Sequence, residues 1–123
     1  MTTYCSRQLY VDRVVASYLR LPGTPFRASR RDRRLAAALC DRGVPLRVVW
    51  AAFVIAAARW AIRGPQQRKL DKIRTLYYFL PAVDEVLDIS PEPGYVQYLA
   101  AKLRPFVAEK ERLLASLGDA TLN

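Results

Sequence analysis

The chain has 123 residues, a formal net charge of +9 and 52% hydrophobic residues. A chain of this length and apolar content forms one domain with a hydrophobic core, which excludes a disordered protein. Its two cysteines form no CxxC pair and histidine is absent, so we expect free thiols, no zinc site and no cofactor. The longest apolar run, residues 48–58, is too short to span a bilayer, so we expect a soluble, cytoplasmic protein without a membrane partner.

Positive charge is concentrated in the first part of the chain. Residues 1–74, here called the basic half, hold 16 basic and 4 acidic residues, whereas residues 75–123, the acidic half, hold 4 and 7. This asymmetry predicts that one part of the protein faces a polyanion and the other part faces something else. Arginine outnumbers lysine 16 to 4, which suits planar recognition of phosphate, although a GC-rich genome gives the same ratio.

The apolar pattern predicts an all-α fold, a compact bundle of about five helices in a single domain over residues 1–123. The first helix is expected from about Ser6 to Leu21, and residues 22–25 (PGTP) end it. The face of this helix that we expect in the core carries Val11, Val14, Val15 and Tyr18.

The second and third helices follow with clear start and stop signals. Ser29 and Asp32 have the spacing of a capping box, and the helix that they begin runs to about Arg42, with Gly43 after its end. Its expected core face carries Leu35, Ala36, Leu39 and Cys40. Pro45 suits the first turn of a third helix, which is apolar on nearly every face, so we expect residues 45–63 to form the central helix.

Two further helices are expected in the acidic half. Thr75 caps a fourth helix that runs to about Leu87 and that Pro81 kinks or divides. After residues 90–94 (SPEPG), a last helix runs from about Tyr95 to Leu117 and is bent at Pro105. Its apolar residues form a narrow seam that fits either a partner helix or the chain's own core. The candidate partner-binding residues of this seam are Leu99, Leu103, Phe106, Leu113 and Leu117.

Five arginines lie within eight residues where the second helix begins: Arg27, Arg30, Arg31, Arg33 and Arg34. A helix N-terminus already carries about half a positive charge, so further cations are unfavourable there unless an anion binds. We interpret the cluster as a clamp for the phosphates of DNA or RNA. The basic connector extends it with Arg68, Lys69, Lys72 and Arg74. The alternatives are a solvated surface, or pairing with acidic residues of the same or another chain.

Aromatic residues follow the basic connector. Tyr77, Tyr78 and Phe79 could stack on unpaired bases, but the favoured interpretation places Phe79 in the core and the tyrosine hydroxyls at the surface. Residues 35–49 have helix-turn-helix character, yet the second of these helices lacks the polar face that reads base edges. We therefore expect binding through the phosphate backbone that is independent of sequence.

The sequence gives little support for catalysis. It contains no histidine, no GxSxG motif and no phosphate-binding glycine loop. Asp84, Glu85 and Asp88 could hold a divalent metal, but an acidic helix face is more often simply solvated. We expect a protein that is not an enzyme.

Residues 31–60, RDRRLAAALCDRGVPLRVVWAAFVIAAARW, resemble the helical modules of DnaD-type replication-initiation and primosomal proteins, in which a glycine-containing turn precedes an apolar helix. In size, helical content, basicity and lack of catalytic residues, the chain is also similar to the small helical subunit of CRISPR effector complexes. Both resemblances imply a non-catalytic protein that binds the phosphate backbone, in different assemblies. The contrast between the basic and acidic halves would also let copies of the chain stack head to tail, so we expect other subunits or copies of itself as partners. The alternative is an interaction subunit that docks its basic face on an acidic protein.

Overall fold

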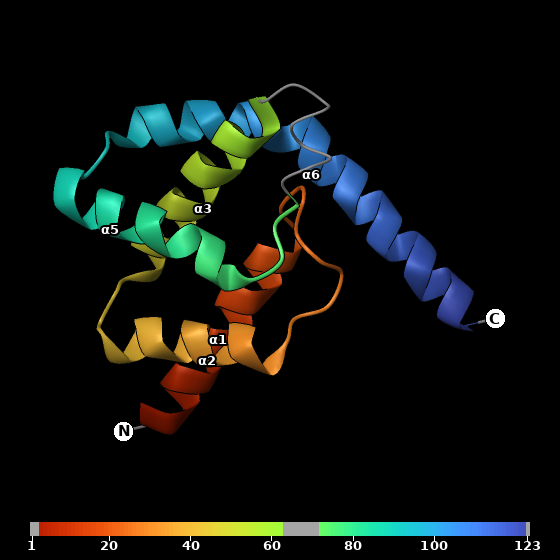
Figure 1. Ribbon diagram of the computed structural model, residues 1–123, viewed down its shortest axis with the longest axis horizontal. Coiled ribbons are helices and arrows are strands. Elements are labelled where there is room, and N and C mark those ends of the chain that lie inside the picture. The colour runs from red at the N-terminus through yellow and green to blue at the C-terminus, as the bar shows by residue number, and fades with distance from the viewer. Residues whose placement is uncertain (1–2, 63–71, 123) are drawn as a thin grey trace.

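The computed structural model describes residues 3–62 and 72–122, with side chains described within residues 7–62 and 72–117 (Figure 1). This part of the chain is helical and contains no strand, which confirms the all-α prediction. The elements are α1 (Thr3–Leu19), α2 (Arg30–Asp41), α3 (Leu46–Ile62), the 3-10 turn η1 (Leu76–Phe79), α5 (Leu80–Ile89) and α6 (Pro93–Leu122). None of the described helices has an apolar stretch long enough to cross a membrane.

Helix α3 is the central helix, as its sequence predicts. It packs against α1, α5 and α6, and Figure 1 shows it running between them. From Val48 to Ala61 its side chains are buried except those of Trp50 and Arg59. A helix without a polar face is stable only when other elements surround it, which explains why the rest of the bundle is organised around α3.

Helix α1 and the turn after it provide one wall of the bundle. The predicted face of α1 is confirmed, because Val11, Val14, Val15 and Tyr18 are all buried. In the following turn, Gly23 has a φ of +83°, and a Cβ at this position would lie 2.6 Å from a ring carbon of Trp60. Only glycine fits both the backbone angle and the close contact with α3.

Pro81 divides the predicted fourth helix rather than kinking it. Thr75 caps η1 through a hydrogen bond from Tyr77 N, as expected of a cap, and α5 then begins at Leu80. Pro81 lies in the first turn of α5, where its missing N–H group has no helical partner to lose. Ser90, with a φ of +55°, ends α5 in the left-handed conformation.

Helix α6 is longer than predicted, because it begins at Pro93 and continues to Leu122. Pro105 lies inside the helix, and Figure 1 shows the first turns lying across α3 and the later turns extending away from the bundle. Proline lacks the N–H group that would bond to the preceding turn, which accounts for a bend at this position.

Candidate nucleic-acid interface

Helix α2 begins with the capping box that the sequence predicts. The hydroxyl of Ser29 accepts a hydrogen bond from Asp32 N at 3.1 Å, and the Asp32 carboxylate accepts one from Ser29 N at 2.9 Å. Asp32 therefore places a negative charge in the first turn, where the helix dipole favours it. The capping box predicted from the spacing of Ser29 and Asp32 is thus confirmed, and it already satisfies part of this helix end. Any phosphate bound here would be held by exposed arginine side chains.

Asp32 also connects α2 to η1. Its side chain is 1% exposed, and its second oxygen, Oδ1, accepts a hydrogen bond from Leu76 N at 2.8 Å, across 44 residues of sequence. Nearby, Ile73 N donates to the carbonyl of Gly23 at 3.1 Å. These two bonds hold residues 72–76 beside the segment that leads into α2. Two basic segments that are far apart in the sequence thus become neighbours.

Four arginines of the predicted cluster are exposed, and no ion pair is found for them within the described residues. They are Arg27, Arg30, Arg31 and Arg34. Arg33 differs, because its guanidinium lies 2.6 Å from a carboxylate oxygen of Asp12 on α1, in an exposed ion pair. A phosphate would have to compete with Asp12 for Arg33, so we regard Arg33 as a peripheral member of the cluster.

The described end of the basic connector joins the same surface. Lys72 and Arg74 are exposed, whereas Arg68 and Lys69 lie outside the described residues. The guanidinium carbon of Arg31 lies 5.8 Å from the ring centroid of Tyr77, which is 53% exposed on η1. This cation–π contact places an exposed aromatic ring beside the arginines of α2. We call Arg27, Arg30, Arg31, Arg34, Lys72, Arg74 and Tyr77 the basic surface.

In the aromatic run after the basic connector, the prediction that Phe79 lies in the core is confirmed. Leu76 and Phe79 are fully buried, and the Phe79 ring meets those of Tyr18 and Phe53 edge to face. Tyr77 and Tyr78 remain partly exposed. Because Leu76 and Phe79 anchor η1 in the core, the exposed residues beside them are held on a rigid support.

Acidic residues pair with other arginines. Across the two halves of the chain, Arg42 lies 3.2 Å from Asp84, Arg59 lies 3.0 Å from Glu85, and Arg20 pairs with Glu111. The hydrogen bond from Arg59 lowers the pKa of Glu85. The acids Asp84 and Glu85, considered above as metal ligands, thus have guanidinium partners, and no group of three or more metal-binding side chains occurs in the described part of the chain.

The predicted partner-binding seam of α6 is split by the structure. Leu99 and Leu103 are buried in the chain's own core, where a partner helix cannot reach them, and Phe106 is partly buried against it. Leu113 and Leu117 are 45% and 50% exposed. The intramolecular alternative is therefore correct for Leu99 and Leu103, whereas the last two leucines are about half exposed.

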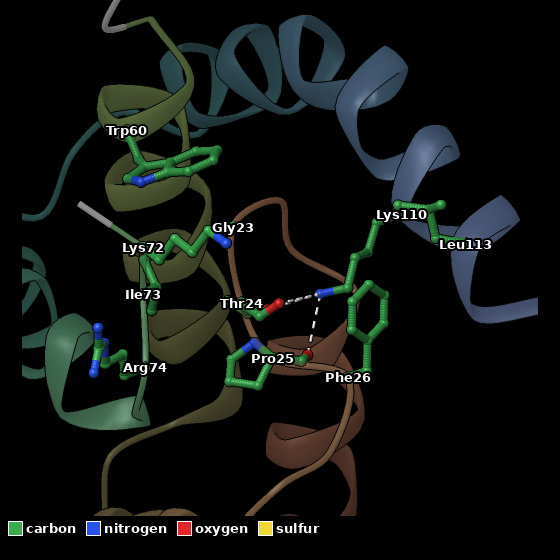
Figure 2. A pocket seen from close by; sticks show the side chains of 10 residues that line it. All are labelled: Gly23, Thr24, Pro25, Phe26, Trp60, Lys72, Ile73, Arg74, Lys110 and Leu113. Carbon is green, nitrogen blue, oxygen red and sulfur yellow. Dashed lines mark hydrogen bonds between the residues drawn. The ribbon is translucent and has the colours of Figure 1, made fainter. Parts of the chain in front are cut away.

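Lys110 lies on this seam and is buried, although it carries an amine. Figure 2 shows it reaching from α6 to the turn after α1, where Nζ donates to the carbonyl of Thr24 at 2.7 Å, to its hydroxyl at 2.7 Å and to the carbonyl of Pro25 at 3.2 Å. Its Nζ also lies 3.1 Å from the Leu21 carbonyl and 4.9 Å from the ring centroid of Phe26. Burial lowers the pKa of the amine to about 8.

A pocket of about 750 Å³ opens beside Lys110 and the basic surface (Figure 2). Apolar and aromatic side chains form most of its lining, and the described lining residues include three cations but no acid. The lining consists of Gly23, Thr24, Pro25, Phe26, Trp60, Lys72, Ile73, Arg74, Lys110 and Leu113. Sequence reasoning missed this pocket, because its walls come from four separate segments of the chain.

Comparison with known proteins finds no match to this chain among family models, curated protein sequences or solved structures.

Proposed function

We propose that this protein is a non-catalytic nucleic-acid-binding protein that contacts the phosphate backbone through its basic surface. The observation that carries the proposal is the set of four exposed arginines at the start of α2, for which no carboxylate partner is found within the described residues. Arginine offers a planar fork of donors that matches phosphate oxygens. Such contacts position a protein on nucleic acid without reading its sequence.

The connection through Asp32 supports this function, because it enlarges the surface. With Lys72 and Arg74 near the four arginines, six cations lie on adjoining segments, which are held together by the bond from Leu76 N to the Asp32 carboxylate and the bond from Ile73 N to the Gly23 carbonyl. If all six neutralise phosphates, log K should fall against log salt with a slope of about −4 for a single strand and about −5 for a duplex. The proposed setting is a larger protein–nucleic acid complex of the replication, mobile-element or defence type.

The test is fluorescence anisotropy with labelled single-stranded RNA, single-stranded DNA and duplex DNA over a range of salt concentrations. The variant Arg30→Glu/Arg31→Glu/Arg34→Glu should lose binding to all three. The matched control, Lys102→Glu/Arg104→Glu/Arg112→Glu on α6, changes the net charge equally and should retain most of the affinity. Equal losses in the two variants would show that net charge, and not the basic surface, drives binding. Affinity that is independent of salt would contradict the proposal.

A protein-interaction subunit is the second candidate function. The observation that favours it is that Leu113 and Leu117, near the end of α6, are 45% and 50% exposed. In this case the basic surface would dock on an acidic protein and α6 would contact a partner helix. The ratio of absorbance at 260 and 280 nm separates the two candidates, since nucleic acid that copurifies favours the first and clean protein that oligomerises favours the second.

A further inference from the structure

We propose that the pocket lined by Phe26 and Trp60 receives an unpaired nucleobase, so that the preferred ligand of this protein is single-stranded nucleic acid. This inference rests on the phosphate-binding function proposed above and adds the class of strand to it. The pocket is next to the basic surface, shares Lys72 and Arg74 with it, and has the size of a small-molecule site.

The walls of the pocket suit a flat, apolar group. Trp60 of α3 is 8% exposed and its ring packs on Gly23, so it forms a fixed apolar wall of the pocket. Opposite lies Phe26, which is 42% exposed and has Lys110 over its ring (Figure 2). Ile73 and Leu113 complete the apolar lining. Phe26 is therefore the ring on which a base would stack, and such stacking has little preference for sequence, because every base has a π-face.

The charges around the pocket suit a phosphate. Lys72 and Arg74 are exposed, and no ion pair holds either of them within the described part of the chain. The Lys110 amine donates to oxygens of Leu21, Thr24 and Pro25, so this residue holds the turn and Phe26 in place. An apolar interior with free cations at its edge is complementary to a nucleotide, which joins a flat base to an anionic group.

The position of Arg74 connects the pocket to the rest of the basic surface. Arg74 lines the pocket and lies three residues before Tyr77, over which Arg31 is placed. A strand whose phosphates follow Arg31 and Arg74 would pass the entrance of the pocket. A base in a duplex enters only after unpairing, which costs a few kcal/mol, so a single strand should bind more tightly.

The experiment compares a labelled oligothymidylate with an abasic strand of equal length, which has the same phosphates but no bases. The wild-type protein should bind the oligothymidylate about tenfold more tightly. Phe26→Ala removes a stacking surface, and Leu113→Trp fills the pocket from its exposed edge. Both variants should bind the two strands equally, with unchanged affinity for the abasic strand.

Two matched controls test whether the effect belongs to the pocket. Tyr98→Ala removes another exposed ring that has a lysine, Lys102, over it, and Leu87→Trp adds an indole to a different exposed leucine. Both controls should keep the preference for bases. Circular dichroism and thermal unfolding check that each variant is folded, and the two pocket variants act in opposite ways, one emptying the site and one filling it.

The possible results of this experiment distinguish a failure of the pocket proposal from a failure of the proposed phosphate binding. Equal wild-type affinity for the two strands, or a preference that survives both pocket variants, would overturn the pocket proposal and leave salt-dependent binding intact. No binding to either strand at low salt would overturn the proposed function itself. Thymidine monophosphate that displaces the oligothymidylate as efficiently as an unlabelled strand would assign the pocket to a free nucleotide, and the single-strand inference would fail.

Discussion

Asp32 is the residue on which the geometry of the basic surface depends. One carboxylate oxygen closes the capping box of α2, and the other accepts the hydrogen bond from Leu76 N. The side chain is almost completely buried, so water cannot replace either bond. The sequence predicted the first role from the spacing to Ser29. It could not predict the second, because nothing local marks a contact with a backbone N–H group 44 residues away.

Replacing Asp32 with alanine should destabilise the protein by about 3 kcal/mol. The change removes the capping-box bond that the carboxylate accepts from Ser29 N, which costs about 1 kcal/mol, and leaves the buried N–H group of Leu76 without an acceptor, which costs about 1–3 kcal/mol. Urea unfolding measures the difference. Asp12→Ala is the control, since the ion pair of Asp12 with Arg33 is exposed and should contribute less than about 1 kcal/mol. Equal effects of the two substitutions would show that Asp32 does not connect α2 to η1.

Lys110 is a buried residue whose burial could not be predicted from the sequence. It has the spacing of the apolar seam of α6, but a lysine at such a position is normally assumed to reach solvent. In the structure it is 4% exposed, because the oxygens of the turn after α1 surround its amine. The same burial lowers its pKa from 10.5 to about 8.

This lowered pKa predicts a dependence of stability on pH. Between about pH 8 and 10.5 the unfolded chain keeps a proton on Lys110 that the folded chain has lost, so the free energy of unfolding should rise with pH in this window. The rise is at most about 1.4 kcal/mol per pH unit. Lys110→Met should remove it, whereas Lys102→Met, at an exposed amine, should not. Stability differences between wild type and Lys110→Met that stay constant across this range would contradict the prediction.

At the scale of elements, the sequence was informative wherever a signal is local. Ser29 caps α2 as expected, Thr75 caps η1, the turn that opens the predicted fourth helix, and Gly43 follows α2 with a positive φ. Pro81 lies in the first turn of α5, directly after η1. These residues act through their own backbone or side chain within a few positions, so their effect can be read without knowledge of the fold.

The seam of α6 is an example of a contact that local sequence signals do not predict. Periodic leucines indicate that a helix packs on something, but they do not say whether the contact is internal. Leu99 and Leu103 precede the bend at Pro105 and pack in the core, whereas Leu113 and Leu117 follow it and are half exposed. The difference depends on where α6 leaves α3, which only the three-dimensional arrangement shows (Figure 1).

Alanine substitutions along α6 should reproduce this division. Leu103→Ala should destabilise the protein by about 2–5 kcal/mol, because it leaves a cavity in the core. Leu113→Ala, at an exposed position, should change stability by about 0.5 kcal/mol or less. Chemical denaturation at a low protein concentration provides both values. A large loss for Leu113→Ala would show that the later turns of α6 pack in the core, which would remove the observation that favours a protein-interaction role.

At the scale of the whole molecule, ion pairs determine where positive charge remains. Exposed pairs such as Arg42 with Asp84 contribute little to stability, about 0–1 kcal/mol each. Their larger effect is on the surface charge, because each pair neutralises the arginine that takes part in it. Arg42 lies at the end of α2 that is opposite to the basic surface, so the two ends of this helix differ in the charge that they offer to a ligand.

This difference predicts which arginines control the salt dependence of binding. Arg30→Ala and Arg74→Ala, on the two segments that Asp32 holds together, should each reduce the slope of log K against log salt by about 1, since each removes one phosphate contact. Arg42→Ala should leave the slope nearly unchanged, because its guanidinium already pairs with Asp84. Anisotropy titrations with one strand at several salt concentrations give all three slopes. A change for Arg30→Ala without one for Arg74→Ala would mean that α2 binds phosphate alone, and that η1 and the residues before it only support the fold.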